Sequence, residues 1–279
     1  MTMQKEKITL TPVQETLLIP LYSKASESVA SPKRRNPIFD DPKAIDILAR
    51  VDYDFACLRV PRETTMTLCF RANKLDAVAR EFLSAHPLGT VVHLGCGLDS
   101  RCLRVGHAGA QWYDLDLPDV IDLRRQFYDE TPTCHMISSS VMELSWTDLI
   151  PRDGPDRAVL VIAEGLLMYL DEAHVKALVL RLKEAFPGCE LAFDAFNTLA
   201  ARRVANHPSL RQTGAVVRWG IDDPKQIEQW APGIRLQEEW FFRQAPEIDR
   251  LAAIYRFASW LAGQFPMANR THRILIYCL

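Results

Sequence analysis

The stretch Val91-Val92-His93-Leu94-Gly95-Cys96-Gly97-Leu98-Asp99-Ser100-Arg101 decides the fold. A short apolar run, typical of a buried strand, leads directly into a Gly-x-Gly turn. Because glycine has no Cβ, the chain can turn sharply here and a ligand can approach the backbone closely. A plain tight turn would also explain two glycines. The turn alone therefore indicates a candidate nucleotide-type site at the carboxyl end of a strand, and Ser100, in place of a third glycine, weakens the case for a dinucleotide.

Outside this stretch, short apolar runs alternate with helical patterns. We expect strands at 91–94, 111–116, 135–138, 158–163, 190–196, 236–243 and 273–278. Helices are expected at 13–28, 42–49, 68–85, 171–186 and 247–262, with Asp41 as the N-cap of the second. The alternation predicts an α/β, Rossmann-like fold, in which helices cover both faces of a mostly parallel seven-stranded sheet.

The composition fits a globular protein and excludes several classes. A net charge of -2, with 48% hydrophobic and 24% charged residues, indicates neither disorder nor nucleic acid as a partner. The seven cysteines form no Cys-x-x-Cys pair, so neither a disulfide framework nor a metal site is predicted. The sequence shows no signal peptide and no apolar run of membrane-spanning length, so we expect a cytoplasmic protein that does not bind membranes.

Two acidic residues stand at the ends of expected strands. Asp116 ends the strand 111–116, about twenty residues beyond the glycines, where a carboxylate can accept both hydroxyls of a ribose. It is preferred over Asp114 because it is nearer the carboxyl end of the strand, although it could instead cap the next helix. Glu164 follows the strand 158–163 among apolar residues, where a charge needs a cationic partner. That partner is either a ligand ammonium group or one of the chain's own arginines.

Three motifs together resemble the leucine carboxyl methyltransferase family, and within it the TcmP-like O-methyltransferase branch of secondary metabolism. They are the segments 94–101, 114–118 and 163–170, and the match in order and spacing runs from about Leu17 to Asp194. The resemblance implies the fold of the class I methyltransferases that use S-adenosylmethionine and release S-adenosylhomocysteine. The length of the chain and the pattern along it predict one domain spanning 1–279. Its parts are a helical cap (1–88), a cofactor-binding core (89–197), a substrate-side insertion (198–235) and C-terminal strands and helix (236–279).

The resemblance also assigns cofactor contacts. Lys24 and Arg71 match basic residues that bind the cofactor's carboxylate, Gly95 faces the methionine portion, Asp116 the ribose and Glu164 the α-amino group. The remaining expected contacts are Cys96, Gly97, Leu117, Ser140, Val141 and Met142. Ser140 stands where the family often has an aspartate that binds adenine, so we leave open whether it replaces that contact.

The catalytic and acceptor-binding residues are less defined. Methyl transfer needs alignment of donor and acceptor and exclusion of water, and a base helps only a hydroxyl acceptor. Tyr169 and His207 are the candidates for such a base, with His174 as a third, and Tyr169, Arg203 and His207 are the expected substrate contacts. Each of them could equally be a surface or packing residue.

The sequence therefore favours an S-adenosylmethionine-dependent O-methyltransferase that acts on a hydroxyl or carboxyl group of a small molecule. We expect a monomer or a homodimer. Two alternatives stay open: a nicotinamide-dependent oxidoreductase, and a non-catalytic cofactor-binding protein of the same fold.

Overall fold

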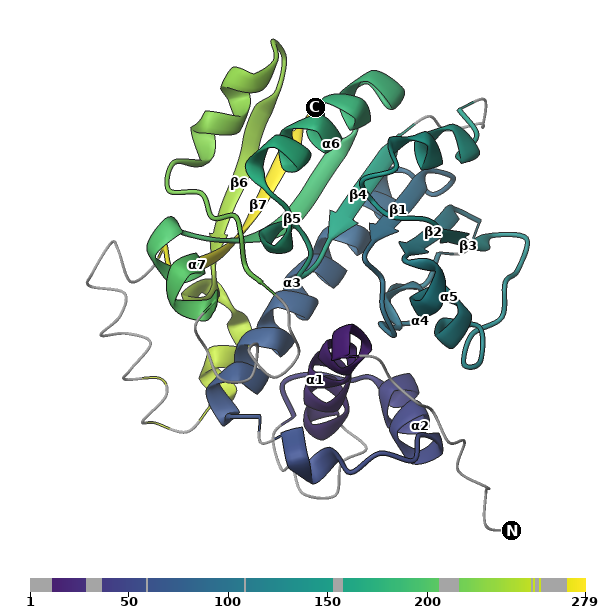
Figure 1. Cartoon of the computed structure of the whole chain (residues 1–279), viewed down its shortest axis with the longest axis vertical. Helices are drawn as coiled ribbons and strands as arrows, with labels where there is room; N and C mark the ends of the chain where they lie inside the picture. The colour runs from purple at the N-terminus through teal and green to yellow at the C-terminus, as the bar shows by residue number, and fades with distance from the viewer. Residues whose placement is uncertain are drawn as a thin grey trace.

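The computed structural model describes residues 12–28, 37–58, 60–107, 109–152, 158–205, 216–251, 253, 256 and 270–279. Seven strands form one sheet in the order β3-β2-β1-β4-β5-β7-β6 (Figure 1). They are β1 (Thr90–Leu94), β2 (Gln111–Asp116), β3 (Cys134–Ser138), β4 (Val159–Ala163), β5 (Glu190–Phe196), β6 (Arg235–Phe241) and β7 (His272–Cys278). The first five are parallel and β7 is antiparallel to both neighbours. The prediction of a mostly parallel seven-stranded sheet is confirmed.

The strand boundaries agree with the sequence pattern to within one residue except at the end of β6. The strand predicted to end at Arg243 ends at Phe241, and residues Phe242–Gln244 form a short 3-10 helix. The Gln244 side chain accepts a hydrogen bond from the Phe241 backbone N–H at 2.7 Å, which closes a turn. A polar side chain thus ended a strand that the apolar pattern alone would have continued.

The helices are α1 (Pro12–Glu27), α2 (Pro42–Arg50), α3 (Arg62–Ala85), α4 (Arg101–Val105), α5 (Pro118–Arg124), α6 (Glu172–Ala185) and α7 (Thr198–Ala205). Asp41 caps α2 as predicted, since its Oδ1 accepts from the Ala44 N–H at 2.9 Å. Short 3-10 helices span Phe55–Leu58, Leu144–Leu149, Leu167–Tyr169, Pro224–Trp230 and Pro246–Arg250. None of the described helices combines the length and the apolarity needed to cross a membrane.

Two predicted helices differ from the structure. Helix α3 begins at Arg62 rather than at residue 68, and its first segment buries Thr65 and Met66. The prediction missed this segment because it contains threonines at 64, 65 and 67, which are weak helix formers. The helix predicted at 247–262 begins instead as the 3-10 helix Pro246–Arg250, and most of its remainder lies outside the described residues. The division of the chain into a cap, a core, an insertion and a C-terminal part stays a prediction.

Apolar layers cover both faces of the sheet. In Figure 1, α6 lies in front of the sheet and α3 behind it. Val175, Leu178 and Leu182 of α6 join one core cluster, and Phe70 and Leu75 of α3 join the other. A third cluster, with Leu18, Ile47 and Leu123 among its members, joins α1 and α2 to α5. Helices α1 and α2 therefore form a cap that is held to the body of the protein by its own apolar contacts.

A buried arginine holds the glycine turn against β2. Arg124, at the end of α5, donates to Asp114 Oδ2 at 2.5 Å and to the carbonyls of Gly97 and Asp99 at 2.9 and 2.8 Å. Asp114 also accepts from the indole N–H of Trp112 at 2.9 Å. Burial opposes ionisation of Asp114, but the Arg124 guanidinium, together with His93 and Trp112, lowers the pKa of that carboxyl. Asp114 is thus a structural residue.

Removing this arginine should destabilise the fold. In Arg124→Met, Asp114 becomes a buried, unpaired carboxylate, which should cost about 3–5 kcal/mol of unfolding free energy in urea denaturation. The neighbouring Arg125→Met is the matched control, because Arg125 is exposed and pairs with exposed acids. Its effect should stay within about 0.5 kcal/mol. Equal effects of the two substitutions would contradict a stabilising role for the Arg124–Asp114 pair.

Candidate active site

A cavity of about 450 Å³ opens at the carboxyl ends of β1 and β4, beneath α1 and the start of α3. Seven of the predicted site residues line it: Lys24, Arg71, Gly95, Cys96, Gly97, Glu164 and Tyr169. The parallel strands all end at this edge of the sheet, which is where α/β folds bind their ligands. The structure therefore brings together residues that are up to 145 positions apart in the sequence.

The glycine turn has the backbone conformation that its sequence indicated. Gly95 and Gly97 have φ of +62° and +50°, in the left-handed region that side chains disfavour. A Cβ on Gly97 would stand 3.0 Å from Leu17 Cδ2 of α1, and a Cβ on Gly95 would stand 3.0 Å from Leu166 Cδ1. The absence of a Cβ at both glycines therefore permits the backbone conformation of the turn and its close packing against Leu17 and Leu166.

Asp116 is fixed by the backbone on both sides. Its Oδ2 accepts from the Gly97 N–H at 2.7 Å, and its Oδ1 accepts from the Leu117 N–H at 2.8 Å. Burial raises the pKa of Asp116 above its ordinary value. The N-cap of α5 is Leu117, without a side-chain cap, so Asp116 does not cap this helix. Each oxygen keeps a further lone pair that a ligand hydroxyl can use.

Glu164 is surrounded by the chain's own cations. It accepts from Arg71 Nε at 3.1 Å and from Arg101 Nη2, and it lies 3.5 Å from Lys24 Nζ. Burial opposes its ionisation, but Lys24, Arg101 and Arg71 together lower the pKa of Glu164. The sequence left open whether the cationic partner of Glu164 is a ligand ammonium group or an arginine of the chain. In the structure, Arg71 and Arg101 are its partners.

Asp99 and Arg101, quoted in the decisive stretch but given no role, extend this ion network. Asp99 lies 3.1 Å from Lys24 Nζ and accepts from Arg104 Nη1 at 2.6 Å. Arg101 also donates to Asp76 at 2.8 Å. The charged residues directly after the glycine turn were the available sequence signal, but their partners lie on other elements. Ser100, in the position of a third glycine, donates to Asp41 Oδ1 at 2.6 Å.

A histidine that the sequence did not single out lines the same cavity. His272, at the start of β7, has Nε2 at 2.8 Å from Asp194 Oδ2 of β5. Asp194 also accepts from Arg71 Nη1 at 2.9 Å and from the Gly165 N–H at 2.5 Å. Burial lowers the pKa of His272, so its ring is neutral at neutral pH. A charged residue inside the apolar run of β5 was the signal that could have found this pair.

The other predicted cofactor contacts do not line this cavity themselves, although Asp116 is hydrogen-bonded to Gly97, which does. Asp116 and Ser138, the last residues of β2 and β3, are paired in register, so Leu117 and the segment Ser140 to Met142 follow neighbouring strand ends. Val141 is buried, whereas Leu117 and Met142 are 41% and 50% exposed, so apolar surface is available next to Asp116.

Of the predicted acceptor contacts, the structure places only Tyr169 at the cavity among the residues that it describes. Tyr169 lines the cavity, and burial raises the pKa of its hydroxyl. Arg203 is exposed on α7 and does not line the cavity, and the half-exposed His174 lies beside Asp171 on α6. His207 lies outside the described residues. The role of Arg203 therefore has no support from its position.

Comparison with known proteins identifies the family. Residues 21–183 match the family model described as leucine carboxyl methyltransferase. Over 273 residues, 98% of each chain, the sequence is 37% identical to the tetracenomycin polyketide synthesis O-methyltransferase TcmP of Streptomyces glaucescens. The chain belongs to the leucine carboxyl methyltransferase family. It is an S-adenosylmethionine-dependent methyltransferase, and the oxidoreductase alternative is wrong.

Other relatives agree with this assignment. The methyltransferase is 34% identical over 262 residues, 86% of each chain, to the S-adenosyl-L-methionine-dependent methyltransferase dpfgK of Gibberella zeae. Among solved structures, a DUF574 family protein of Streptomyces avermitilis has a TM-score of 0.56 at 13% identity, over 94% of this chain and 96% of the other. A Thermobifida fusca protein described as a methyltransferase has a TM-score of 0.52 at 15% identity, over 92% and 93%. At these identities the likeness shows the fold alone.

Proposed function

We propose that this methyltransferase transfers the methyl group of S-adenosylmethionine to a hydroxyl or carboxyl group of a small molecule of secondary metabolism. The observation that carries the proposal is the 37% identity to TcmP along 98% of both chains, which includes the parts that roof the cavity. TcmP is an O-methyltransferase of polyketide synthesis, so a polyketide-like compound is the first acceptor class to test.

We propose that the cofactor lies along the carboxyl ends of β1, β2 and β4. Lys24 and Arg71 would bind its carboxylate, Glu164 its ammonium group and Asp116 its ribose. Gly95, Cys96 and Gly97 would contact the methionine portion, and Leu117, Ser140, Val141 and Met142 the adenine. The buried Asp99 Oδ2 has no hydrogen-bond partner, although Arg101 Nη2 stands 3.3 Å away. This oxygen can therefore still accept a hydrogen bond from a ligand.

The charge of the site supports this cofactor. The largely buried ion network consists of Lys24, Arg71, Arg101 and Arg104 with Asp41, Asp76, Asp99, Glu164 and Asp194. A fifth cation, Arg80, lies 4.0 Å from Asp76 but is 52% exposed, so within the buried part of the network the carboxylates outnumber the cations by one. S-adenosylmethionine, with a sulfonium, an ammonium and a carboxylate, carries one net positive charge. The product is neutral, so the attraction weakens after transfer and favours release.

When bound, S-adenosylmethionine would supply a sulfonium methyl group that an acceptor oxygen can displace in line. The chain's contribution is to align the two ligands and to exclude water. For a hydroxyl acceptor, His272 can also take up the proton. Its Nε2–H donates to Asp194, which leaves Nδ1 as the accepting atom. A carboxylate acceptor is already ionised and would not use this pair.

Asp116→Ala tests the cofactor placement. Loss of the two acceptor oxygens should weaken S-adenosylhomocysteine binding by about 1–3 kcal/mol, or roughly 5- to 150-fold in Kd by titration calorimetry. Asp122→Ala, an exposed aspartate of α5, is the control and should leave Kd unchanged. Melting without ligand should be recorded for both, because Asp116 also anchors Gly97. Unchanged affinity in a folded Asp116→Ala protein would refute the ribose assignment.

Acceptor chemistry can be tested with labelled S-adenosylmethionine. Polyketide-like hydroxy acids should be offered in three forms: free, with the carboxyl group blocked, and with the hydroxyl groups blocked. We expect transfer to at least the free form, and the blocked form that still reacts identifies the acceptor group. If the protein binds S-adenosylhomocysteine tightly but methylates no member of the series or of a cell extract, the non-catalytic alternative is favoured.

His272→Asn distinguishes the two acceptor groups at the level of mechanism. With a phenolic acceptor, kcat should fall by roughly 10²–10⁴-fold near neutral pH and recover as the pH rises toward the pKa of the phenol. With a carboxylate acceptor, kcat should change little. In the unaltered enzyme, kcat for a phenol should fall as the pH drops through the lowered pKa of His272. Tyr169→Phe is the control, since it removes a cavity hydroxyl and keeps the pair. A flat pH profile unaffected by His272→Asn would exclude this base.

A further inference from the structure

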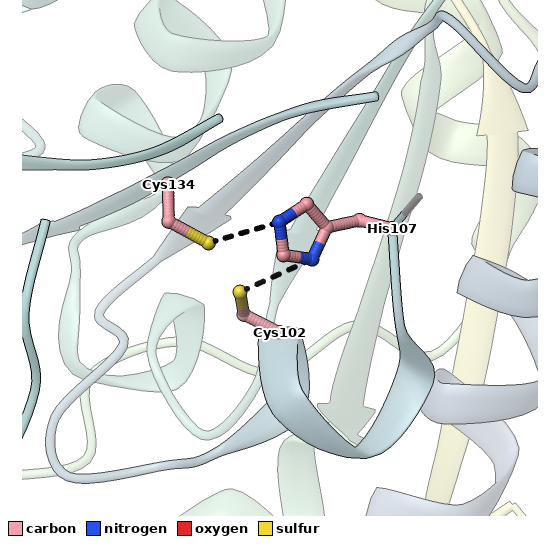
Figure 2. A group of neighbouring side chains, drawn as sticks. All are labelled: Cys102, His107 and Cys134. Atoms are coloured by element: carbon pink, nitrogen blue, oxygen red, sulfur yellow. Dashed lines mark hydrogen bonds between the residues drawn. The ribbon is translucent and has the colours of Figure 1, made fainter. Parts of the chain in front are cut away.

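We propose that Cys102, His107 and Cys134 form a binding site for zinc(II), separate from the methyl-transfer cavity. These side chains come from the second residue of α4, the loop that follows it, and the first residue of β3. Figure 2 shows the two sulfur atoms on the same side of the His107 ring, each directed at one ring nitrogen. One ligand atom from each residue lies within 4.8 Å of the other two. None of the three lines the cavity.

The backbone holds all three residues in place without any ion. Gly106, with φ of +72°, ends α4, and its N–H donates to the carbonyl of Cys102 at 3.2 Å. The His107 carbonyl accepts from the Ala110 N–H at 2.6 Å. Cys134 is fixed by a tight turn in which its N–H donates to Thr131 Oγ1 at 2.9 Å. A prearranged site loses little chain entropy when an ion binds.

The distances are close to those that a zinc site requires. Cys102 Sγ lies 3.5 Å from His107 Nδ1, and Cys134 Sγ lies 3.3 Å from His107 Nε2. In a tetrahedral site, Zn–S of about 2.3 Å and Zn–N of about 2.0 Å place sulfur and nitrogen roughly 3.5 Å apart. Only one ring nitrogen can bind the ion, so one thiol must turn toward the nitrogen that the other already faces. Thr133 Oγ1, 3.2 Å from Nε2, or water is available for the fourth position.

The donor set selects the ion. Two thiolates and an imidazole suit soft and borderline ions such as zinc rather than magnesium or calcium. Zinc takes the place of the two thiol protons, which pass to solvent. The resulting complex of one divalent cation, two thiolates and a neutral imidazole has no net charge. A neutral complex fits this site, in which Cys102 is buried and the other two residues are partly buried, without a counter-ion.

Zinc at this position would tie α4 to the start of β3. Helix α4 also carries Arg101 and Arg104, which hold Asp99 and Asp76 of the ion network. The site is therefore structural in character, and its occupation should raise the melting temperature. This zinc site differs from the sequence-based prediction of no metal site, which rested only on the absence of a Cys-x-x-Cys pair.

Zinc binding should be measured on the full-length, reduced and metal-stripped protein by competition with a chromophoric chelator. We expect one equivalent of zinc to bind and the melting temperature to rise. Cobalt(II) should give intense thiolate charge-transfer bands and the visible bands of a tetrahedral complex. Loss of an outer-shell partner alone costs roughly 10–100-fold in affinity, so Cys102→Ser, His107→Gln and Cys134→Ser should each lose at least that much. Cys278→Ser, a partly buried thiol elsewhere, is the matched control and should bind normally.

Melting of each variant without metal separates loss of binding from loss of folding. If the variants do not fold, alkylation of the unaltered protein decides the question, because zinc should protect Cys134 and leave Cys278 as reactive as before. The proposal is overturned if no stoichiometric zinc binds, if the cobalt spectrum lacks thiolate bands, if Cys278→Ser weakens binding equally, or if zinc fails to protect Cys134.

Discussion

A single buried carboxylate, Glu164, imposes the strongest constraint on this structure. It stands at the end of β4 in surroundings where an unpaired charge would be too costly to keep. Its partners come from three different elements: Lys24 of α1, Arg71 of α3 and Arg101 of α4. Satisfying this one charge therefore fixes the position of the helical cap relative to the sheet. The apolar contacts of α1 and α2 hold the cap against the body of the protein, whereas the ion pairs to Glu164 fix the orientation of the cap.

The same network keeps the cavity polar and ionised on one side. Because the cations lower the pKa of Glu164 and of Asp194, both carboxylates stay charged well below neutral pH. The positions of these charges are set before any ligand arrives, so a cationic ligand meets dipoles and charges that need little reorganisation. Arg71 contacts both carboxylates and thereby links Glu164 to the His272–Asp194 pair. In the arrangement that we propose, this guanidinium would connect the cofactor to the base.

The sequence predicted the centre of the sheet well because β1 and β4 are buried on both faces and read as nearly continuous apolar runs. It predicted the glycine turn and Asp116 because both depend on local geometry at one strand end. It did not predict Asp99, Arg101 or His272 as site residues, because their roles depend on partners 63 to 78 positions away. These partners are Lys24 for Asp99, Glu164 for Arg101 and Asp194 for His272. The start of α3 was missed for a different reason: threonine is a weak helix former in isolation, and tertiary burial decided the outcome.

The acceptor end of the cavity shows why the substrate is harder to predict than the cofactor. A cofactor that is shared by a whole fold is bound at strand ends, so its contacts recur at positions that the fold itself defines. The end that we propose for the acceptor is instead lined by Tyr169, Phe196, Val204 and His272, which come from four separate elements of the chain. Arg203 precedes Val204 on the same helix yet points to solvent, because one step along a helix turns a side chain by about 100°. The composition of the insertion does not show which of Arg203 and Val204 lines the cavity. The orientation of α7 decides this.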